Sequence, residues 1–247
     1  MPIDKKKQKY EKTGLILLAS TLLFLGSCDS GDIECVRASD EVITEIRDFN
    51  SFDGVVTNIV GDVSVSQGAG YAVKITGPDN VVAQTSTSID GHLLVVGSDA
   101  CFNGAYDLKV EVTAPDFSLI NLSGVGDIST VGIISAGRLE MEMMGAGKIT
   151  AQVDADTLLT LISGTGEIAY NGTAARHDLI CAGKYTLNAY DLMTEDTYIQ
   201  LTGTGDSYIS ASNRLDVRIT GNGNVFYKGN PVVTREIIGT GDVLDKN

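Results

Sequence analysis

The sequence predicts an all-β protein built as a β-solenoid, a single-stranded β-helix-like stack of Gly-x-Gly repeats. Glycine is abundant, at 28 residues against 4 prolines, which together with many β-branched residues favours strands joined by tight turns. Segments such as Leu215–Ile219 alternate apolar and polar residues, as a strand with one buried face does. A short glycine motif recurs from about residue 117 onward, and units this short bury an apolar face only by stacking. A β-sandwich made of hairpins is the alternative architecture.

The chain begins with a segment that has the three parts of a signal peptide, residues 1–27. Five lysines are followed by an apolar run from Gly14 to Gly26, and small residues precede Cys28. The run is shorter than the roughly 20 residues of a spanning helix. This arrangement resembles the lipobox of bacterial lipoproteins, which implies acylation of Cys28, as with palmitate, and attachment to a membrane through N-terminal acyl chains. The alternatives are a secretory signal with an incidental cysteine and an uncleaved anchor helix.

The next segments are expected to be a tether over residues 28–40 and one continuous β domain over residues 41–247. Within that domain, residues 41–115 form irregular strands with turns at Gly77–Asn80 and Asp90–Gly91. The expected strands lie at Phe52–Val56, Val60–Val65, Tyr71–Ile75, His92–Val96 and Leu108–Thr113.

Residues 116–247 contain seven repeats, each interpreted as a strand, a glycine corner and a second strand. We expect glycine to be needed for a positive φ or for close backbone approach. In the fourth repeat Cys181 stands where the others have their first glycine, so that position needs a small residue. The second glycines, 17 to 22 residues apart, are the expected structural turn residues: Gly126, Gly147, Gly166, Gly183, Gly205, Gly223 and Gly241.

Charge and cysteine usage restrict the classes of partner and compartment. The net charge is −14, and because residues 1–27 carry +3, the chain from Cys28 onward carries −17. That excess of acidic residues argues against nucleic acid as a partner, because binding nucleic acid requires lysine and arginine side chains that neutralise its phosphates. The cell envelope is oxidising, so we expect one disulfide, between Cys35 and Cys101, while Cys181 is expected to be a small buried residue.

The ordered series of motifs resembles the putative auto-transporter adhesin, head GIN domain family. The features that carry the resemblance are Phe52–Val55, the Val-x-Val-Thr-x-Pro step at Val110–Pro115, the Ser/Thr-Gly-x-Gly-Asp repeats, and Lys228–Pro231 before the last repeat. The resemblance implies a solenoid-like fold on secreted lipoproteins of Gram-negative bacteria. It implies no catalytic residues, and the adhesin description is itself an analogy because a fold does not define a function.

The repeats offer three groups of residues with possible chemical roles. A calcium ladder between coils would need acidic oxygens throughout, but Lys148 and Lys184 interrupt the acidic position, so capped turns are favoured and no metal or other cofactor is expected. His92 and His177 lack a catalytic motif and are interpreted as surface or satisfied strand residues. Six tyrosines could line a binding face or be ordinary strand residues: Tyr170, Tyr185, Tyr190, Tyr198, Tyr208 and Tyr227.

These observations predict a membrane-anchored envelope lipoprotein, sited at the outer membrane, with a non-enzymatic binding or scaffold role such as adhesion. Its partner would be an unidentified protein or glycan. The alternatives are a polysaccharide-active enzyme, which would need two carboxyl groups flanking one bond, and a structural or sensory component of envelope maintenance.

Overall fold

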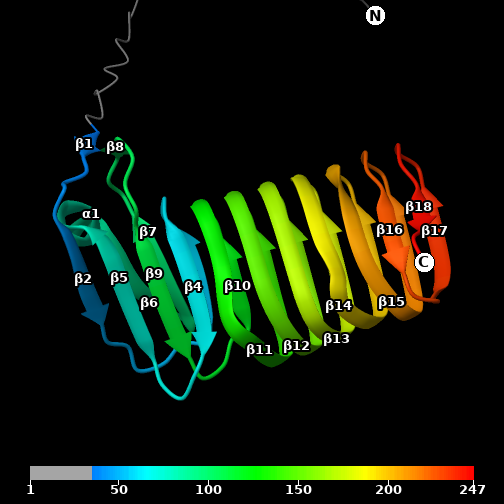
Figure 1. Ribbon diagram of the computed structural model, residues 1–247, viewed down its shortest axis with the longest axis horizontal. Helices are drawn as coiled ribbons and strands as arrows, with labels where there is room; N and C mark the ends of the chain where they lie inside the picture. The colour runs from blue at the N-terminus through cyan, green and yellow to red at the C-terminus, as the bar shows by residue number, and fades with distance from the viewer. Residues whose placement is uncertain (1–34) are drawn as a thin grey trace, which may run out of the picture. The chain divides into compact units, whose positions relative to one another are not determined.

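The structure confirms the predicted β-solenoid, with stacked coils that make about seven turns (Figure 1). This computed structural model describes residues 35–247, which belong to one compact unit. The expected signal peptide, Cys28 and the start of the expected tether lie outside the described residues. Within residues 35–247 no helix is both long enough and apolar enough to cross a membrane.

The repeat region is made of long strands that each wind once around the axis, flanked by shorter ones. Its strands are β10 (Leu119–Leu122), β11 (Val125–Met143), β12 (Ala146–Ile162), β13 (Thr165–Cys181), β14 (Lys184–Leu201), β15 (Thr204–Ile219), β16 (Val225–Lys228), β17 (Val232–Ile237) and β18 (Val243–Asp245). All of them pair in parallel with a strand of a neighbouring coil.

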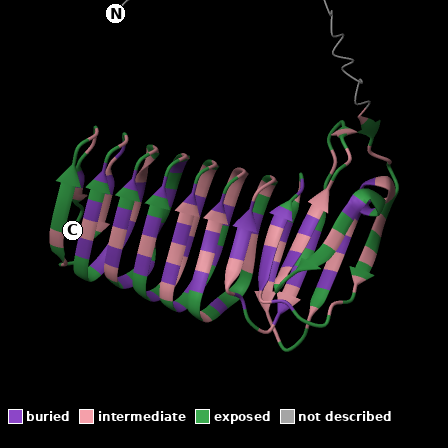
Figure 2. Cartoon of the chain, turned by 180° about the vertical axis from the view of Figure 1, so that it is seen from behind, coloured by how far each residue is buried: buried purple, intermediate pink, exposed green. Residues whose placement is uncertain are grey.

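The core is a set of rows in which equivalent side chains stack from coil to coil. Alternate residues point inward, and Figure 2 shows the resulting stripes of buried and exposed positions across the coils of β11 to β15. The registers define two such rows, and both are buried along β11 to β15. One row is Ile128, Ile149, Ile168, Leu187 and Ser207, and the other is Met141, Thr160, Leu179, Ile199 and Val217.

The first part of the chain extends both walls of the stack and then closes its end. Its elements are β1 (Val36–Arg37), β2 (Val42–Arg47), β3 (Gly54–Asn58), β4 (Asp62–Gln67), β5 (Ala72–Pro78), α1 (Asp79–Gln84), β6 (Thr85–Asp90), β7 (Leu93–Ser98), β8 (Phe102–Asn103) and β9 (Lys109–Ala114). One wall continues from β10 through β3 and β7 in parallel and ends on the antiparallel strand β6. The other continues from β11 through β4 and β9 and ends on the antiparallel strands β5 and β2.

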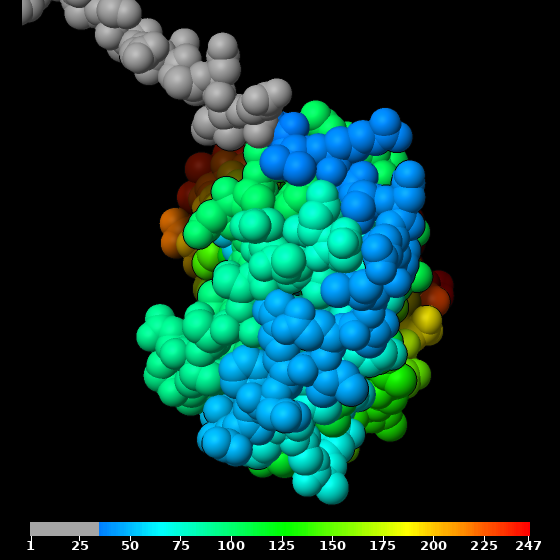
Figure 3. Space-filling view, turned by 90° about the vertical axis from the view of Figure 1, so that its left-hand side faces the viewer, coloured from blue at the N-terminus to red at the C-terminus, as the bar shows by residue number. Residues whose placement is uncertain are grey.

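The short helix α1 covers the core at this end of the stack. Its residues Val81 and Val82 are buried, and Figure 3 looks directly onto the end that this part of the chain covers. The sequence predicted only a turn at Gly77–Asn80; the helix forms because Val81 and Val82 can then cover apolar strand residues that have no further coil beyond them. The predicted hairpin at Asp90–Gly91 is present between β6 and β7, with Gly91 at a φ of 62°.

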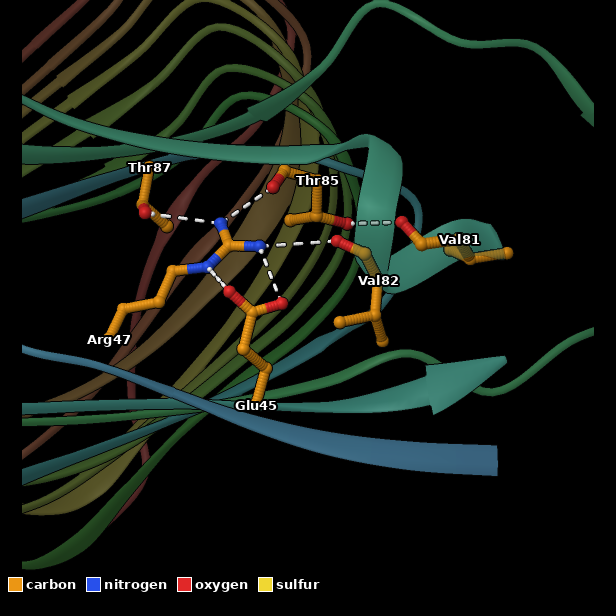
Figure 4. Close-up of polar contacts among 6 residues, drawn as sticks. All are labelled: Glu45, Arg47, Val81, Val82, Thr85 and Thr87. Atoms are coloured by element: carbon orange, nitrogen blue, oxygen red, sulfur yellow. Dashed lines mark hydrogen bonds and ion pairs between the residues drawn. The ribbon is translucent and has the colours of Figure 1, made fainter. Parts of the chain in front are cut away.

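Arg47 ties β2 to the segment that follows α1 (Figure 4). Its guanidinium donates to the carbonyl oxygens of Val82 and Thr85 at 3.2 and 2.6 Å and to the Thr87 hydroxyl at 3.1 Å. It also pairs with Glu45 at 2.9 Å. These bonds satisfy carbonyl groups where the helix ends, so one side chain links three elements of the closing end.

The tether was expected to extend to residue 40, but from Cys35 onward the chain is bonded to the β domain. Cys35 and Cys101 form a disulfide, the expected pair, and β1 pairs in parallel with β8 beside it. The Asn80 side chain then donates to the carbonyl of Arg37 at 2.9 Å. Residues 35–40 are therefore attached to the β domain by covalent and backbone bonds. The sequence did not predict this attachment, because residues 35–40 have no clear strand pattern.

The register corrects the predicted alignment of the fourth repeat. Cys181 pairs with Ile162 and Leu201 and so lies in an inward apolar row, not in a glycine position. Gly183 falls in the row of first glycines, and Tyr185 pairs with Gly166 and Gly205 in the row of second glycines. With Tyr185 in the row of second glycines, successive members of that row are 21, 19, 19, 20, 18 and 18 residues apart. This spacing is more regular than the 17 to 22 residues obtained with Gly183.

The first glycines are required by close approach of neighbouring coils. A Cβ at Gly145 would lie 1.9 Å from the carbonyl oxygen of Gly124, and one at Gly164 would lie 2.0 Å from that of Gly145. No side chain fits that space, so the expectation of close backbone approach is correct for this row. Positive φ contributes only in the second row, for example 146° at Gly147.

Candidate functional site

One outer face of the solenoid combines arginine, acidic and apolar side chains, and we call it the arginine–tyrosine face. It consists of the outward residues of the strand segments that precede each glycine corner in β11 to β15 and of β17. The registers arrange these residues in three rows: Arg138, Thr157, Arg176, Asp196, Arg214 and Val232; Glu140, Leu159, Asp178, Tyr198, Asp216 and Thr234; and Glu142, Leu161, Ile180, Gln200, Arg218 and Glu236.

This face carries an open hollow of about 570 Å³. Leu159 and Ile180 supply apolar surface in it, and Ile180 is 42% exposed. Charged side chains from several coils, Arg138, Arg218 and Glu236 among them, line the rest. A shallow apolar area with a polar surround is the usual composition of a surface that binds a macromolecule.

Tyr198 lines the hollow and lies between two arginines. The guanidinium of Arg176 lies 4.1 Å from the ring centroid and that of Arg214 lies 5.3 Å from it. Each arginine also pairs with the acid two residues further along its strand, Arg176 with Asp178 at 2.8 Å and Arg214 with Asp216. These contacts hold the side chains of three coils in fixed positions, so the face presents a preorganised surface.

Most carboxylates of this face pair with basic side chains. Asp178, Asp216 and Glu236 pair with arginines. Burial, followed by the hydrogen bond and the charge of Glu142, raises the pKa of Glu140. Glu140 also lies 4.0 Å from a guanidinium nitrogen of Arg138, and Glu142 accepts a hydrogen bond from the side-chain amide of Asn121.

The polar residues after the second glycines cap the backbone of the next coil. The Asp127 carboxylate accepts from the amide of Lys148 at 2.9 Å, and that of Asp206 accepts from the amide of Asn224 at 2.8 Å. These bonds give the acidic positions a structural role in the turns. Within residues 35–247 no group of three or more His, Cys, Asp or Glu side chains is arranged to hold a metal ion.

The two histidines have different surroundings. His177 is 1% exposed in the core, where its Nε2 lies 3.0 Å from the Thr160 hydroxyl and burial lowers its pKa to about 4. The interpretation of His177 as a surface residue is therefore wrong, and the interpretation as a satisfied strand residue is correct. His92 is exposed, with Nε2 3.6 Å from a carboxylate oxygen of Asp53.

The tyrosines divide between the core and the surface. Tyr170 and Tyr185 point inward and are buried, with the Tyr185 hydroxyl 2.8 Å from that of Ser207. Cys181 is buried and unpaired, and burial raises the pKa of its thiol to about 12. Tyr198 lies on the arginine–tyrosine face, while Tyr190 and Tyr208 lie on another part of the surface.

Sequence reasoning missed the arginines of this face. Arg138, Arg176 and Arg214 each lie seven residues before a first glycine, at Gly145, Gly183 and Gly221. That periodicity was present in the sequence, but the misalignment of the fourth repeat placed Arg176 at a different offset from the other two.

Comparison with known proteins matches this fold and these motifs. The family model for the putative auto-transporter adhesin, head GIN domain matches residues 51–231. A putative adhesin from Bacteroides fragilis superposes with a TM-score of 0.81 at 23% identity, over 85% of this chain and 100% of that one. A putative adhesin from Parabacteroides distasonis superposes with a TM-score of 0.69 at 19% identity, over 86% of this chain and 100% of that one.

A third similar structure is described as a putative lipid binding protein from Parabacteroides distasonis. Its TM-score is 0.67 at 19% identity, over 87% of this chain and 100% of that one. No curated protein matches the sequence. At these identities the similarity shows a shared fold.

Proposed function

Because this chain belongs to the putative auto-transporter adhesin, head GIN domain family, we propose that it is an acylated lipoprotein of the cell envelope that binds a macromolecular partner without catalysing a reaction. The arginine–tyrosine face is the surface that contacts the partner. The observation that carries this proposal is the hollow of about 570 Å³, where residues from successive coils combine apolar and charged groups.

The character of that face supports binding over catalysis. Its arginines and acids are paired with one another, and Tyr198 is enclosed by two guanidiniums. Surfaces of this kind bind macromolecules mainly through a few well-packed tyrosine and arginine side chains, and the surrounding contacts contribute little energy. The family description and the similar folds described as adhesins are consistent with attachment to another molecule as the role.

Membrane attachment in this proposal rests on the sequence. Cys28 follows a signal-like segment, and two or three acyl chains contribute enough buried methylene groups to hold a protein on a bilayer. The β domain begins at Cys35, so few residues separate the acylated cysteine from the first covalent link of the fold. We place the protein at the outer membrane on this basis.

The anchoring is tested by expressing the full chain and Cys28→Ala in a Gram-negative host with an alkyne analogue of palmitate. The expected result is label and membrane fractionation for the original chain and neither for the variant. Label on Cys28→Ala would contradict acylation at this residue.

The binding role is tested by measuring adhesion of cells that carry the protein to arrays of matrix proteins and glycans. Arg176→Ala with Arg218→Ala is expected to reduce adhesion at least about tenfold, which corresponds to about 1.4 kcal/mol. Lys148→Ala with Lys184→Ala makes the same charge change away from this face and serves as the control. Equal loss in both double variants, or adhesion unchanged in the first, would contradict the assignment of the face.

A further inference from the structure

A second part of the surface, over the last coils, gathers aromatic rings and lysines, and we call it the aromatic–lysine strip. It is made of outward residues of β14, β15, β16 and β18 together with Lys246. The strip consists of Tyr190, Tyr208, Phe226, Leu244, Lys228 and Lys246. None of these residues lines the hollow of the arginine–tyrosine face.

The rings of the strip stack along the solenoid axis. Tyr208 and Phe226 are parallel, with ring centroids 4.9 Å apart, and the Tyr190 ring meets that of Tyr208 edge to face at 5.5 Å. All three rings are half-buried, so each keeps part of its surface in contact with solvent. Tyr208, Phe226 and Leu244 occupy equivalent positions in successive coils, since each pairs with the next.

The two lysines lie beside the rings and have no carboxylate partner within residues 35–247. The Lys228 ammonium lies 4.4 Å from the centroid of Tyr190, and that of Lys246 lies 5.2 Å from the centroid of Phe226. By contrast, Lys74 and Lys148 pair with glutamates, and the arginines of the arginine–tyrosine face pair with acids. In a chain with a net charge of −14, this strip offers positive charge that is free for an external anion.

A row of polar groups borders the rings on the other side. Asp206, Asn224 and Asp242 precede Tyr208, Phe226 and Leu244 by two residues each, and so lie beside them on the same outer surface. The Asp206 carboxylate accepts from the amide and side chain of Asn224, and Asp242 pairs with Arg235. Asp206 and Asp242 therefore have partners other than Lys228 and Lys246.

We propose that the aromatic–lysine strip is a binding site for an anionic polysaccharide, a linear glycan with carboxylate-bearing sugars. Three adjacent rows run along the axis, with coils about 4.8 Å apart: Asp206, Asn224 and Asp242; Tyr208, Phe226 and Leu244; and Ser210, Lys228 and Lys246. Aromatic rings occupy the middle row on two coils and ammonium groups occupy the third row on two coils, so a polymer laid along the axis meets both kinds of group. Its hydroxyls contact the polar row, its sugar rings contact the aromatic row, and its carboxylates contact Lys228 and Lys246.

The proposal is tested with the full chain in detergent micelles, by calorimetric titration with polygalacturonate and, for comparison, with neutral dextran. Binding is expected for polygalacturonate only, and it should weaken as salt is added because the lysine contacts are exposed. Lys228→Gln with Lys246→Gln is expected to weaken binding about tenfold, and Tyr208→Ser should weaken it by a similar factor.

Arg176→Gln with Arg218→Gln is the matched control, because it removes the same charge from the arginine–tyrosine face. Retention of polygalacturonate binding in this control supports the aromatic–lysine strip as the binding site, whatever the effect of the control on cell adhesion. The proposal for the strip and the proposal for the arginine–tyrosine face can therefore be rejected separately. Equal weakening in both double variants would show that only net charge matters and would overturn the proposal. No binding of polygalacturonate, or equal binding of dextran, would also overturn it. Circular dichroism melts identify any variant that fails to fold.

Discussion

The repeated coils of β11 to β15 and the closing end formed by β2, β5, α1 and β6 are stabilised in different ways. In the coils every inward residue stacks on its equivalents before and after, and backbone bonds run from coil to coil. In the closing end the pairing becomes antiparallel, and single contacts such as those of Arg47 and the Cys35–Cys101 disulfide connect the elements.

This difference shows how a stack with one repeated environment needs a distinct structure where it stops. The coils tolerate variation in outward side chains but not in the volume between neighbouring backbones. The closing end, which lacks a preceding coil, depends on helix α1 and on hydrogen bonds to a few carbonyl groups. Substitutions in the two regions should therefore have effects of different size and origin.

The largest effect is expected for Gly145→Ala in the coils. Its Cβ would lie 1.9 Å from the carbonyl oxygen of Gly124, and relief of that contact requires two coils to separate. We expect the free energy of unfolding to fall by at least about 3 kcal/mol, measured by urea denaturation. Gly70→Ala in the N-terminal region is the control, because its Cβ would meet no atom within 4 Å. Equal destabilisation by the two variants would contradict the role of close coil packing.

The next effect concerns pH and the buried His177 in the coils. Burial lowers its pKa in the folded protein to about 4, whereas an unfolded histidine has a pKa of about 6.5. Between these values the unfolded chain binds the extra proton, so the stability contributed by the neutral ring is lost as pH falls from about 6.5 toward 4. The expected loss is about 3 kcal/mol, measured as the change in unfolding free energy over that range.

His177→Leu should remove this part of the pH dependence, while His92→Leu, an exposed position at the N-terminal end, should retain it. If the pH dependence of the unfolding free energy persisted in His177→Leu and disappeared in His92→Leu, it would come from His92, and the role given to His177 would be wrong.

In the closing end, Arg47→Met is expected to cost about 2 kcal/mol. The methionine keeps the apolar stem but leaves the carbonyl groups of Val82 and Thr85 without the donors seen in the structure. Thermal unfolding measures the change. Lys74→Met, which breaks the exposed pair with Glu111, is the control and should cost no more than about 1 kcal/mol. If Arg47→Met destabilised the protein no more than the control, the closing end would not depend on individual contacts such as those of Arg47.

The smallest effect is expected at the polar turn positions of the coils. Asp206→Ala removes the acceptor for the Asn224 amide and should cost about 1 kcal/mol. Asp90→Ala, at the exposed hairpin turn between β6 and β7, is the control.

Excess calcium chloride should leave the melting temperature of the original chain unchanged, since the turn carboxylates already bind backbone amides. An increase in melting temperature that depends on Asp206 would support a calcium ladder instead.

The glycine periodicity and the alternation of residues such as Leu215–Ile219 favoured stacked coils over a sandwich of hairpins, because a short unit with one apolar face buries that face when units stack. The hairpin at Asp90–Gly91 was also predictable, since its turn chemistry is local. The same local patterns and the ordered motifs were sufficient to identify the family.

Only the tertiary structure decided the register of the fourth coil, the closing helix and the composition of the outer faces. Tyr185 rather than Gly183 occupies the second corner position, because bonds between coils set the register and local sequence similarity does not. Arg176, Tyr198 and Arg214 come from three different strands and meet only when those strands align. Alternation tells which residues point outward, but hydrogen bonds between coils determine which of those residues become neighbours.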